Sequence, residues 1–309
     1  MSRRALVLFA LMSLVWGIPY LLIRIAVAEI SPATLVFART AIASAILLPV
    51  ALLRVDMRPV LARWRWVIAF AVIEVGLPWL LLSSAEERVT SSLAGLLVAG
   101  VPLVGAVIAV TTGGRDRLGT AGLAGLLVGL VGVAAIVGVD ARASNVGALA
   151  EMAVVVVCYA LGPAILGRRL GGLPSVGVMA LALSFCAAVY APIVAIQHPA
   201  TLPGTDVLAA VAILGVVCTA AAFLLFSALV EAMGPVRATV ITYVNPAVAA
   251  VLGVALLHEP FAPVMAVGFG LVILGSAMAT GSGTAMRLGT RIVARRDRQS
   301  MVEADESTV

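Results

Sequence analysis

The chain has 309 residues, of which 62% are hydrophobic and only 11% are charged, and its formal net charge is +5. Soluble domains carry a charged fraction of roughly 25%, so a water-soluble fold could not bury this much apolar chain. The positive charge requires no nucleic acid partner, because the basic residues flank apolar segments, and the three cysteines lack the spacing of a disulfide or metal framework.

Apolar stretches of about 20 residues recur along the chain, and about 20 helical residues cross a hydrocarbon layer of roughly 30 Å. Strands of a membrane barrel would alternate polar and apolar residues over segments of about ten, whereas these stretches are apolar on every face. The sequence therefore predicts an all-α integral membrane protein with about ten transmembrane helices. In chain order they are expected at residues 5–24, 33–53, 67–85, 91–112, 119–138, 147–167, 174–196, 206–229, 237–256 and 263–282.

The arginines predict the orientation of these helices, because basic loops remain on the cytoplasmic side of a membrane. If the N-terminus is cytoplasmic, most of the 20 basic residues fall on that side. The exceptions are Arg24, Arg88 and Arg142, which fall outside, and Arg39, which lies within the second helix. We therefore expect a multi-pass protein of the inner (cytoplasmic) membrane with both termini cytoplasmic.

An internal repeat divides the chain. At a spacing of 144 residues the identical pairs are Pro19 with Pro163, Arg24 with Arg168, Ser83 with Ser227, Glu87 with Glu231 and Pro102 with Pro246. The predicted units are a first five-helix repeat at 1–143, a second at 144–283, and a basic then acidic cytoplasmic tail at 284–309. Because five is an odd number, the second repeat must be inverted in the membrane. Inverted repeats are typical of secondary transporters, in which the substrate lies between the halves.

Several short motifs occur in an order that resembles one family. They are Trp16-Gly17, Phe37-Ala38-Arg39, Pro102, Asn245-Pro246, Glu259-Pro260, and the glycines Gly268, Gly270 and Gly275. With these motifs the chain resembles the EamA-type transporters of the drug/metabolite transporter superfamily over residues 5–282. It departs from the family pattern at Gly113-Gly114-Arg115-Asp116, where a Gly-Glu pair is usual. The resemblance implies efflux of amino acids or related small metabolites, either proton-coupled or facilitated, without a cofactor.

Two ionisable residues are expected within the membrane, where such groups cost a few kcal/mol and are candidate functional residues. Glu74 lies near the middle of the third helix and Arg39 in the outer half of the second. In the functional hypothesis, Glu74 takes up a proton or contacts a substrate ammonium, and Arg39 holds a substrate carboxylate or the helix geometry. The alternatives are a purely structural Arg39–Glu74 pair or an arginine that extends to the outer headgroups.

Small residues line one face of the fourth and of the ninth predicted helix, and each helix carries a proline in mid-span, Pro102 or Pro246. Such faces allow close helix packing, which is the first interpretation. In the second, both prolines break their helices and the freed carbonyls face a cavity. Its walls would include Trp16, Tyr20, Trp79, Tyr243 and Asn245.

Two shorter patterns have structural interpretations. Gly125 and Gly129 have GxxxG spacing, which favours internal packing over a homodimer. His258-Glu259 lacks the second histidine of a zinc motif, so Glu259 is expected to be an acid at a helix end in an outer loop.

Other functions fit less well. The chain has no lysine and hence no P-loop for ATP, and neither histidine is expected at membrane depth, so we predict no enzyme and no metal site. Carriers of lipid-linked or nucleotide-activated sugars would need more cationic residues in the cavity. A non-transporting membrane scaffold would need no inverted repeat.

Overall fold

The computed structural model describes residues 3–111, 120–140, 146–197, 202–233 and 241–279. These residues form helices and connecting turns, with no strand among them. The helices are α1 (Arg3–Ala26), α2 (Pro32–Arg54), α3 (Arg58–Ala62), α4 (Trp64–Phe70), α5 (Leu77–Glu86), α6 (Ser91–Val98), α7 (Val101–Thr111), α8 (Thr120–Asp140), α9 (Val146–Arg169), α10 (Ser175–Gln197), α11 (Thr205–Gly215), α12 (Ala222–Met233) and α14 (Ile241–Leu257). Two π-helical turns, η1 (Ala71–Gly76) and η2 (Val216–Ala221), join α4 to α5 and α11 to α12.

The prediction of an all-α membrane protein is confirmed. Within the described ranges, eight helical segments are long and apolar enough to cross a membrane, starting with Arg3–Ala26 and ending with Thr205–Ala232. Helices Ile241–Leu257 and Pro263–Ala279 occupy the last two expected segments but are shorter. The count of ten spans therefore stays a prediction.

Local sequence sets several helix ends. The Ser31 hydroxyl accepts a hydrogen bond from the Thr34 backbone nitrogen at 3.2 Å and so caps α2, and Pro32 follows in the first turn, where its missing N–H costs nothing. The fourth predicted helix is interrupted between the end of α6 at Val98 and the start of α7 at Val101, and Pro102 is the second residue of α7. A break next to this proline was predicted. Pro246 does not break α14, so that prediction is wrong. The reason is that a membrane helix can continue through a proline when its surroundings satisfy the freed carbonyl.

Helices α2 and α6 of the first half pack against their counterparts in the second half, α10 and α14. The hydroxyls of Ser44 on α2 and Ser184 on α10 lie 2.6 Å apart. On α6, a side chain at Gly95 would lie 2.7 Å from Ala249 of α14. This contact confirms the predicted close packing of the two small-residue faces.

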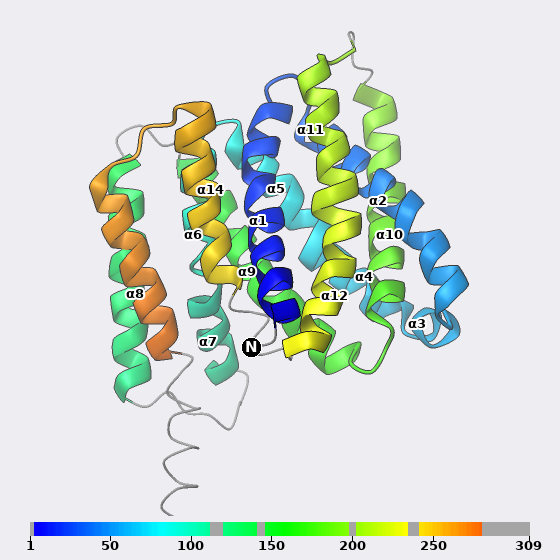
Figure 1. Cartoon of the computed structure of the whole chain (residues 1–309), viewed down its shortest axis with the longest axis horizontal. Coiled ribbons are helices and arrows are strands. Elements are labelled where there is room, and N and C mark those ends of the chain that lie inside the picture. Colours follow the sequence, from blue (N-terminus) through cyan, green and yellow to red (C-terminus); the bar gives the residue numbers. More distant parts are fainter. Residues whose placement is uncertain (1–2, 112–119, 141–145, 198–201, 234–240, 280–309) are drawn as a thin grey trace, which may run out of the picture.

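The helix Pro263–Ala279 packs against α8 in the same way (Figure 1). A Cβ added at Gly132 would lie 2.6 Å from the Gly268 carbonyl oxygen, and one added at Gly125 would lie 2.7 Å from the Gly275 carbonyl oxygen. Only glycines allow this backbone approach. The interpretation that the glycines of α8 serve internal packing is therefore confirmed.

The two halves run in opposite directions. In Figure 1, the N-terminus, α3 and the connection from α9 to α10 lie at the lower end of the bundle, and the connection from α1 to α2 lies at the upper end. Accordingly, Arg24 in the last turn of α1 lines a pocket together with Glu259, whereas Arg168 in the last turn of α9 lines another pocket together with Arg63. This is the relation that an inverted repeat requires.

Candidate functional site

Arg39 is buried between the two halves, with 7% of its surface exposed. It lies on α2, where its Nε donates a hydrogen bond to the Thr219 hydroxyl on η2 at 2.8 Å. The centre of its guanidinium lies 3.7 Å from the centroid of the Trp79 ring on α5, a cation–π contact. Within the described part of the chain its Nε makes the hydrogen bond that involves this side chain, so the four N–H donors of its two terminal nitrogens have no protein acceptor there.

Aromatic hydroxyls complete the surroundings of this arginine. Tyr20 on α1 and Tyr159 on α9 are both electrostatic neighbours of Arg39, and Tyr159 also lies next to Trp79. Tyr20 and Trp79 are each 7% exposed. We call Tyr20, Arg39, Trp79, Tyr159 and Thr219 the arginine cluster. Five different helical segments contribute to it.

The Glu74 side chain points toward α9 and not toward Arg39. It lies on η1 against α9, where a side chain added at Gly162 would meet its carboxylate, and its neighbours there include Cys158 and Tyr159. Its Oε2 atom is buried without a hydrogen bond in the described structure. No ion pair joins it to Arg39 among these residues. The suggested Arg39–Glu74 pair is therefore wrong: α2 turns Arg39 toward η2, whereas η1 turns Glu74 toward α9.

The two π-helical turns occupy equivalent places in the two halves, and each is braced by the other half. Tyr190 on α10 donates a hydrogen bond to the Gly76 carbonyl of η1 at 3.0 Å. On the opposite side, Arg39 of α2 binds Thr219 of η2, whose own hydroxyl donates to the Leu214 carbonyl at 2.7 Å. Single π turns are frequent at functional sites. Glu74 and Thr219 both lie on such turns.

The other predicted residues lie apart from the arginine cluster. Trp16 packs against Phe223 and Phe226 of α12, with ring centroids 6.1 and 4.9 Å away. Asn245 is buried on α14, and with its amide nitrogen turned to the backbone it donates to the carbonyls of Ser13 and Ile241 at 3.1 and 3.0 Å. Tyr243 is half-buried on the same helix. Trp16 and Asn245 thus hold α1 to its neighbours.

Glu86 is a buried acid that the sequence reasoning missed. It is fully buried at the end of α5, and neither carboxylate oxygen has a hydrogen-bond partner among the described residues. Its electrostatic neighbours include Arg24, Arg39 and Glu259, and the Arg24 guanidinium donates to its backbone carbonyl. The adjacent Glu87 is exposed. Because the two residues are identical and adjacent, the sequence does not indicate which of them is buried.

A carboxylate joins the two halves at the upper end of the bundle. One Glu259 oxygen accepts from the backbone nitrogen and hydroxyl of Ser91 at 2.8 and 2.9 Å, and the other from the same groups of Ser92 at 2.9 and 2.5 Å. An acid suits this position, because the N-terminus of α6 presents unpaired N–H groups and a positive dipole end. We call this arrangement the Glu259 clamp.

The turn that follows α14 orients the Glu259 carboxylate toward α6. His258 has a φ of 53°, the left-handed conformation common just after a helix C-terminus, and the Glu259 nitrogen donates to the Gly253 carbonyl of α14 at 3.1 Å. A side chain added at Gly253 would meet Glu259 and both serine hydroxyls. The sequence placed Glu259 at a helix end but offered no sign of its partners, which lie 167 and 168 residues away.

A concave site beside the clamp has a volume of about 410 Å³. Its lining residues come from both halves and are Arg24, Ile25, Thr90, Leu257, His258, Glu259 and Pro260. Among the described residues, no group of three or more His, Cys, Asp or Glu could hold a metal ion.

Membrane-spanning helices in two similar halves with a buried polar cluster between them are typical of secondary transporters. The chain belongs to the EamA-like transporter family, which matches it twice, over residues 3–138 and 148–281. It is therefore a multi-pass membrane transporter of the drug/metabolite transporter type. A solved crystal structure is similar in fold, with a TM-score of 0.65 at 22% identity over 93% of this chain and 99% of the other. No curated protein matches the chain.

Proposed function

We propose that the protein is a secondary transporter that exports a small metabolite, such as an amino acid or a related compound, by alternating access. It would lie in the cytoplasmic membrane with both termini inside and ten spans in two units, 1–143 and 144–283. The observation that carries the proposal is Arg39, an arginine buried between the halves with four uncommitted donors.

The arginine cluster suits a substrate carboxylate. A guanidinium binds a carboxylate through two parallel hydrogen bonds, and the Thr219 and Trp79 contacts fix the guanidinium plane in advance. Tyr20 and Tyr159 add hydroxyl groups beside it. In this proposal Arg39 holds the carboxylate, and Glu74 takes up a proton or contacts a substrate ammonium.

The Glu259 clamp supports alternating access. It ties α6 of the first half to the chain after α14 of the second half through one carboxylate. If the halves rock against each other, these hydrogen bonds must break when the upper end opens. In the inverted repeat the equivalent segment of the first half falls at residues 113–116, outside the described residues, where the sequence has Gly-Gly-Arg-Asp.

Metabolite profiles of the medium test the export proposal. Cells with the native protein are compared with cells that carry Arg39→Gln at equal membrane abundance, and Arg58→Gln is the control because Arg58 is exposed at the start of α3. We expect at least one small carboxylate-containing compound to accumulate in the medium with the native protein and with Arg58→Gln, but not with Arg39→Gln. Identical media in all three strains would contradict the proposal.

A further inference from the structure

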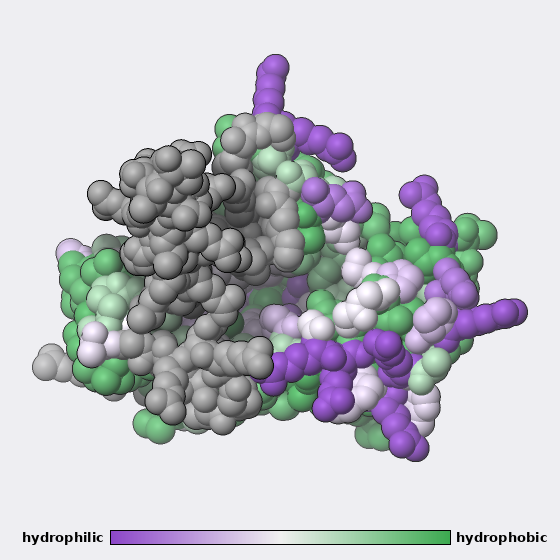
Figure 2. All heavy atoms as spheres, turned by 90° about the horizontal axis from the view of Figure 1, so that it is seen from below, coloured by the Kyte–Doolittle hydropathy of each residue, from purple (hydrophilic) through white to green (hydrophobic). Residues whose placement is uncertain are grey.

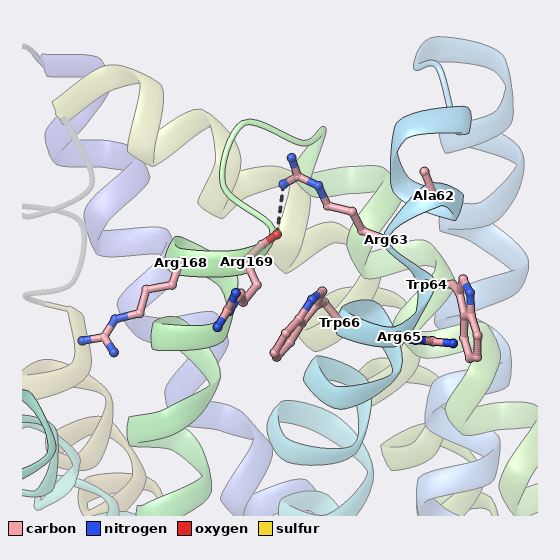
Figure 3. Close-up of a pocket in the computed structure, with 7 residues that line it drawn as sticks. All are labelled: Ala62, Arg63, Trp64, Arg65, Trp66, Arg168 and Arg169. Carbon is pink, nitrogen blue, oxygen red and sulfur yellow. Dashed lines mark hydrogen bonds between the residues drawn. The ribbon is translucent and has the colours of Figure 1, made fainter. Parts of the chain in front are cut away.

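A basic pocket opens at the lower end of the bundle, where α4 begins and α9 ends. Its volume is about 570 Å³, and its lining consists of Ala62, Arg63, Trp64, Arg65, Trp66, Arg168 and Arg169 (Figure 3). Four arginines and two tryptophans thus line the pocket, and its lining contains no carboxylate. We propose that this pocket binds the phosphate-containing headgroup of an anionic phospholipid.

A helix break builds one wall of the pocket. Helix α3 ends at Ala62, and Arg63 leaves helical geometry with φ −105° and ψ 26° before α4 starts at Trp64. The Arg63 guanidinium then donates to the carbonyl of Arg169 at 2.9 Å (Figure 3). Because the last carbonyls of a helix lack intrahelical partners, Arg63 caps α9 and holds the two walls together.

Two of the guanidinium groups are oriented by tryptophans rather than by acids. The centre of the Arg169 guanidinium lies 4.5 Å from the Trp66 ring centroid, and that of Arg65 lies 5.5 Å from the Trp64 ring centroid. Neither Arg65 nor Arg169 has an ion pair in the described structure. The pocket therefore gathers positive charges that repel one another, and a bound anion relieves this repulsion. Guanidinium pairs match phosphate oxygens in geometry as well as in charge.

The position of the pocket identifies the phosphate as that of a lipid. Trp64 starts one membrane-spanning segment and Arg169 ends another, so the pocket lies at the level where headgroups meet water. Trp64 and Trp66 are 53% and 40% exposed, and tryptophan side chains favour this level. Figure 2 shows the lower end of the bundle from below. Hydrophilic side chains cluster there in the region where Figure 1 places α3, and apolar surface surrounds them.

The bound lipid would bridge the two halves, because α4 belongs to the first half and α9 to the second. It would therefore stabilise one arrangement of the halves at the lower end. Basic pockets between helices on the cytoplasmic side suit anionic headgroups, and the assignment of the lipid to the inner leaflet rests on the orientation proposed above. Binding itself does not depend on that orientation, so the experiment below tests the pocket separately from the transport proposal.

Thermal unfolding of the purified full-length protein in a neutral detergent provides the test. Phosphatidylglycerol, phosphatidylcholine and inorganic phosphate are titrated in separate arms against the native chain, Arg65→Gln/Arg169→Gln and Arg54→Gln/Arg58→Gln. The last variant removes the same charge from exposed sites outside the pocket lining. We expect phosphatidylglycerol to raise the Tm of the native chain and of the Arg54/Arg58 variant, with at least tenfold weaker apparent affinity for the Arg65/Arg169 variant. The other two additives should leave the Tm unchanged.

Two results would overturn the proposal. One is an equal loss of affinity in both double variants, because the lipid would then respond only to overall charge. The other is an equal shift with inorganic phosphate, because the pocket would then not select a lipid. If Arg65→Gln/Arg169→Gln does not fold, Arg65→Lys/Arg169→Lys replaces it. Lysine keeps the charge but lacks the planar fork, so it too should weaken phosphatidylglycerol binding, and unchanged binding would contradict the proposal.

Discussion

The Glu259 clamp gives a prediction whose size follows from its four hydrogen bonds. In Glu259→Gln the amide oxygen still accepts from one serine, but the amide nitrogen faces the backbone N–H of the other, which loses its acceptor, while that serine's hydroxyl turns to accept from the amide. The lost hydrogen bond to a charged group costs about 1.5 kcal/mol, and the three remaining bonds, now neutral, are each weaker by about 0.5 kcal/mol, which together give about 3 kcal/mol. Since 1.4 kcal/mol corresponds to a factor of ten, we expect the upper end to open roughly 100-fold more often.

Cysteine labelling measures this opening. Ala250 is 6% exposed on α14, and its carbonyl oxygen lies 3.4 Å from Ser92 Oγ on α6, so an Ala250→Cys thiol should react only when α6 and α14 separate. The background chain lacks Cys158, Cys186 and Cys218. In intact cells, a membrane-impermeant maleimide should label Ala250→Cys up to roughly 100-fold faster when Glu259→Gln is added.

Two controls make this result specific. Leu202→Cys, at a position that is 94% exposed, should be labelled equally in both backgrounds. Glu29→Gln removes another acid at the same end, one that binds the Gly204 nitrogen and does not bridge α6 and α14, and it should leave the Ala250→Cys rate unchanged. Equal rates of Ala250→Cys labelling with and without the Glu259→Gln substitution would refute the role of the clamp.

Three further predictions concern the cluster, the acid on η1 and the packing of α8. Arg39→Lys keeps the charge but loses the Nε–Thr219 hydrogen bond and the flat contact with Trp79; we expect export at least tenfold slower, and undiminished export would argue against a role for the guanidinium plane. Glu74→Gln should abolish any pH dependence of transport in vesicles, and a full pH response in this variant would remove Glu74 as the proton acceptor. Gly132→Ala places a Cβ 2.6 Å from the Gly268 carbonyl oxygen and should destabilise the protein by about 1–3 kcal/mol in thermal unfolding, whereas Gly138→Ala, which meets no atom within 4 Å, should not.

Features carried by runs of residues were predictable from the sequence. The helical segments follow from the apolar stretches, and the break before Pro102 follows from a proline in mid-span. The inversion of the halves follows from the positions of Arg24 and Arg168, which lie in pockets at opposite ends. Each of these inferences needs only hydrophobicity, charge or backbone chemistry along one stretch of chain.

Features that depend on which helix faces which were not predictable. Arg39 and Glu74 lie on consecutive predicted helices, yet α2 turns its arginine to the second half. Glu86 and Glu87 are adjacent, and only the packing of α5 buries the first of them. Pro246 is the counterpart of Pro102 in the repeat, but α14 continues through it. Rotation of a helix about its axis and the partners of a turn are fixed by tertiary contacts, which composition does not encode.

Release of labelled amino acids from liposomes tests the central claim most directly. Purified native protein and Arg39→Gln are reconstituted at equal density into liposomes loaded with a mixture of labelled amino acids. We predict that at least one amino acid leaves the native liposomes and is retained with Arg39→Gln, as in protein-free liposomes. Equal release by the native protein and the Arg39→Gln variant would contradict a carboxylate-binding role for the arginine between the two halves.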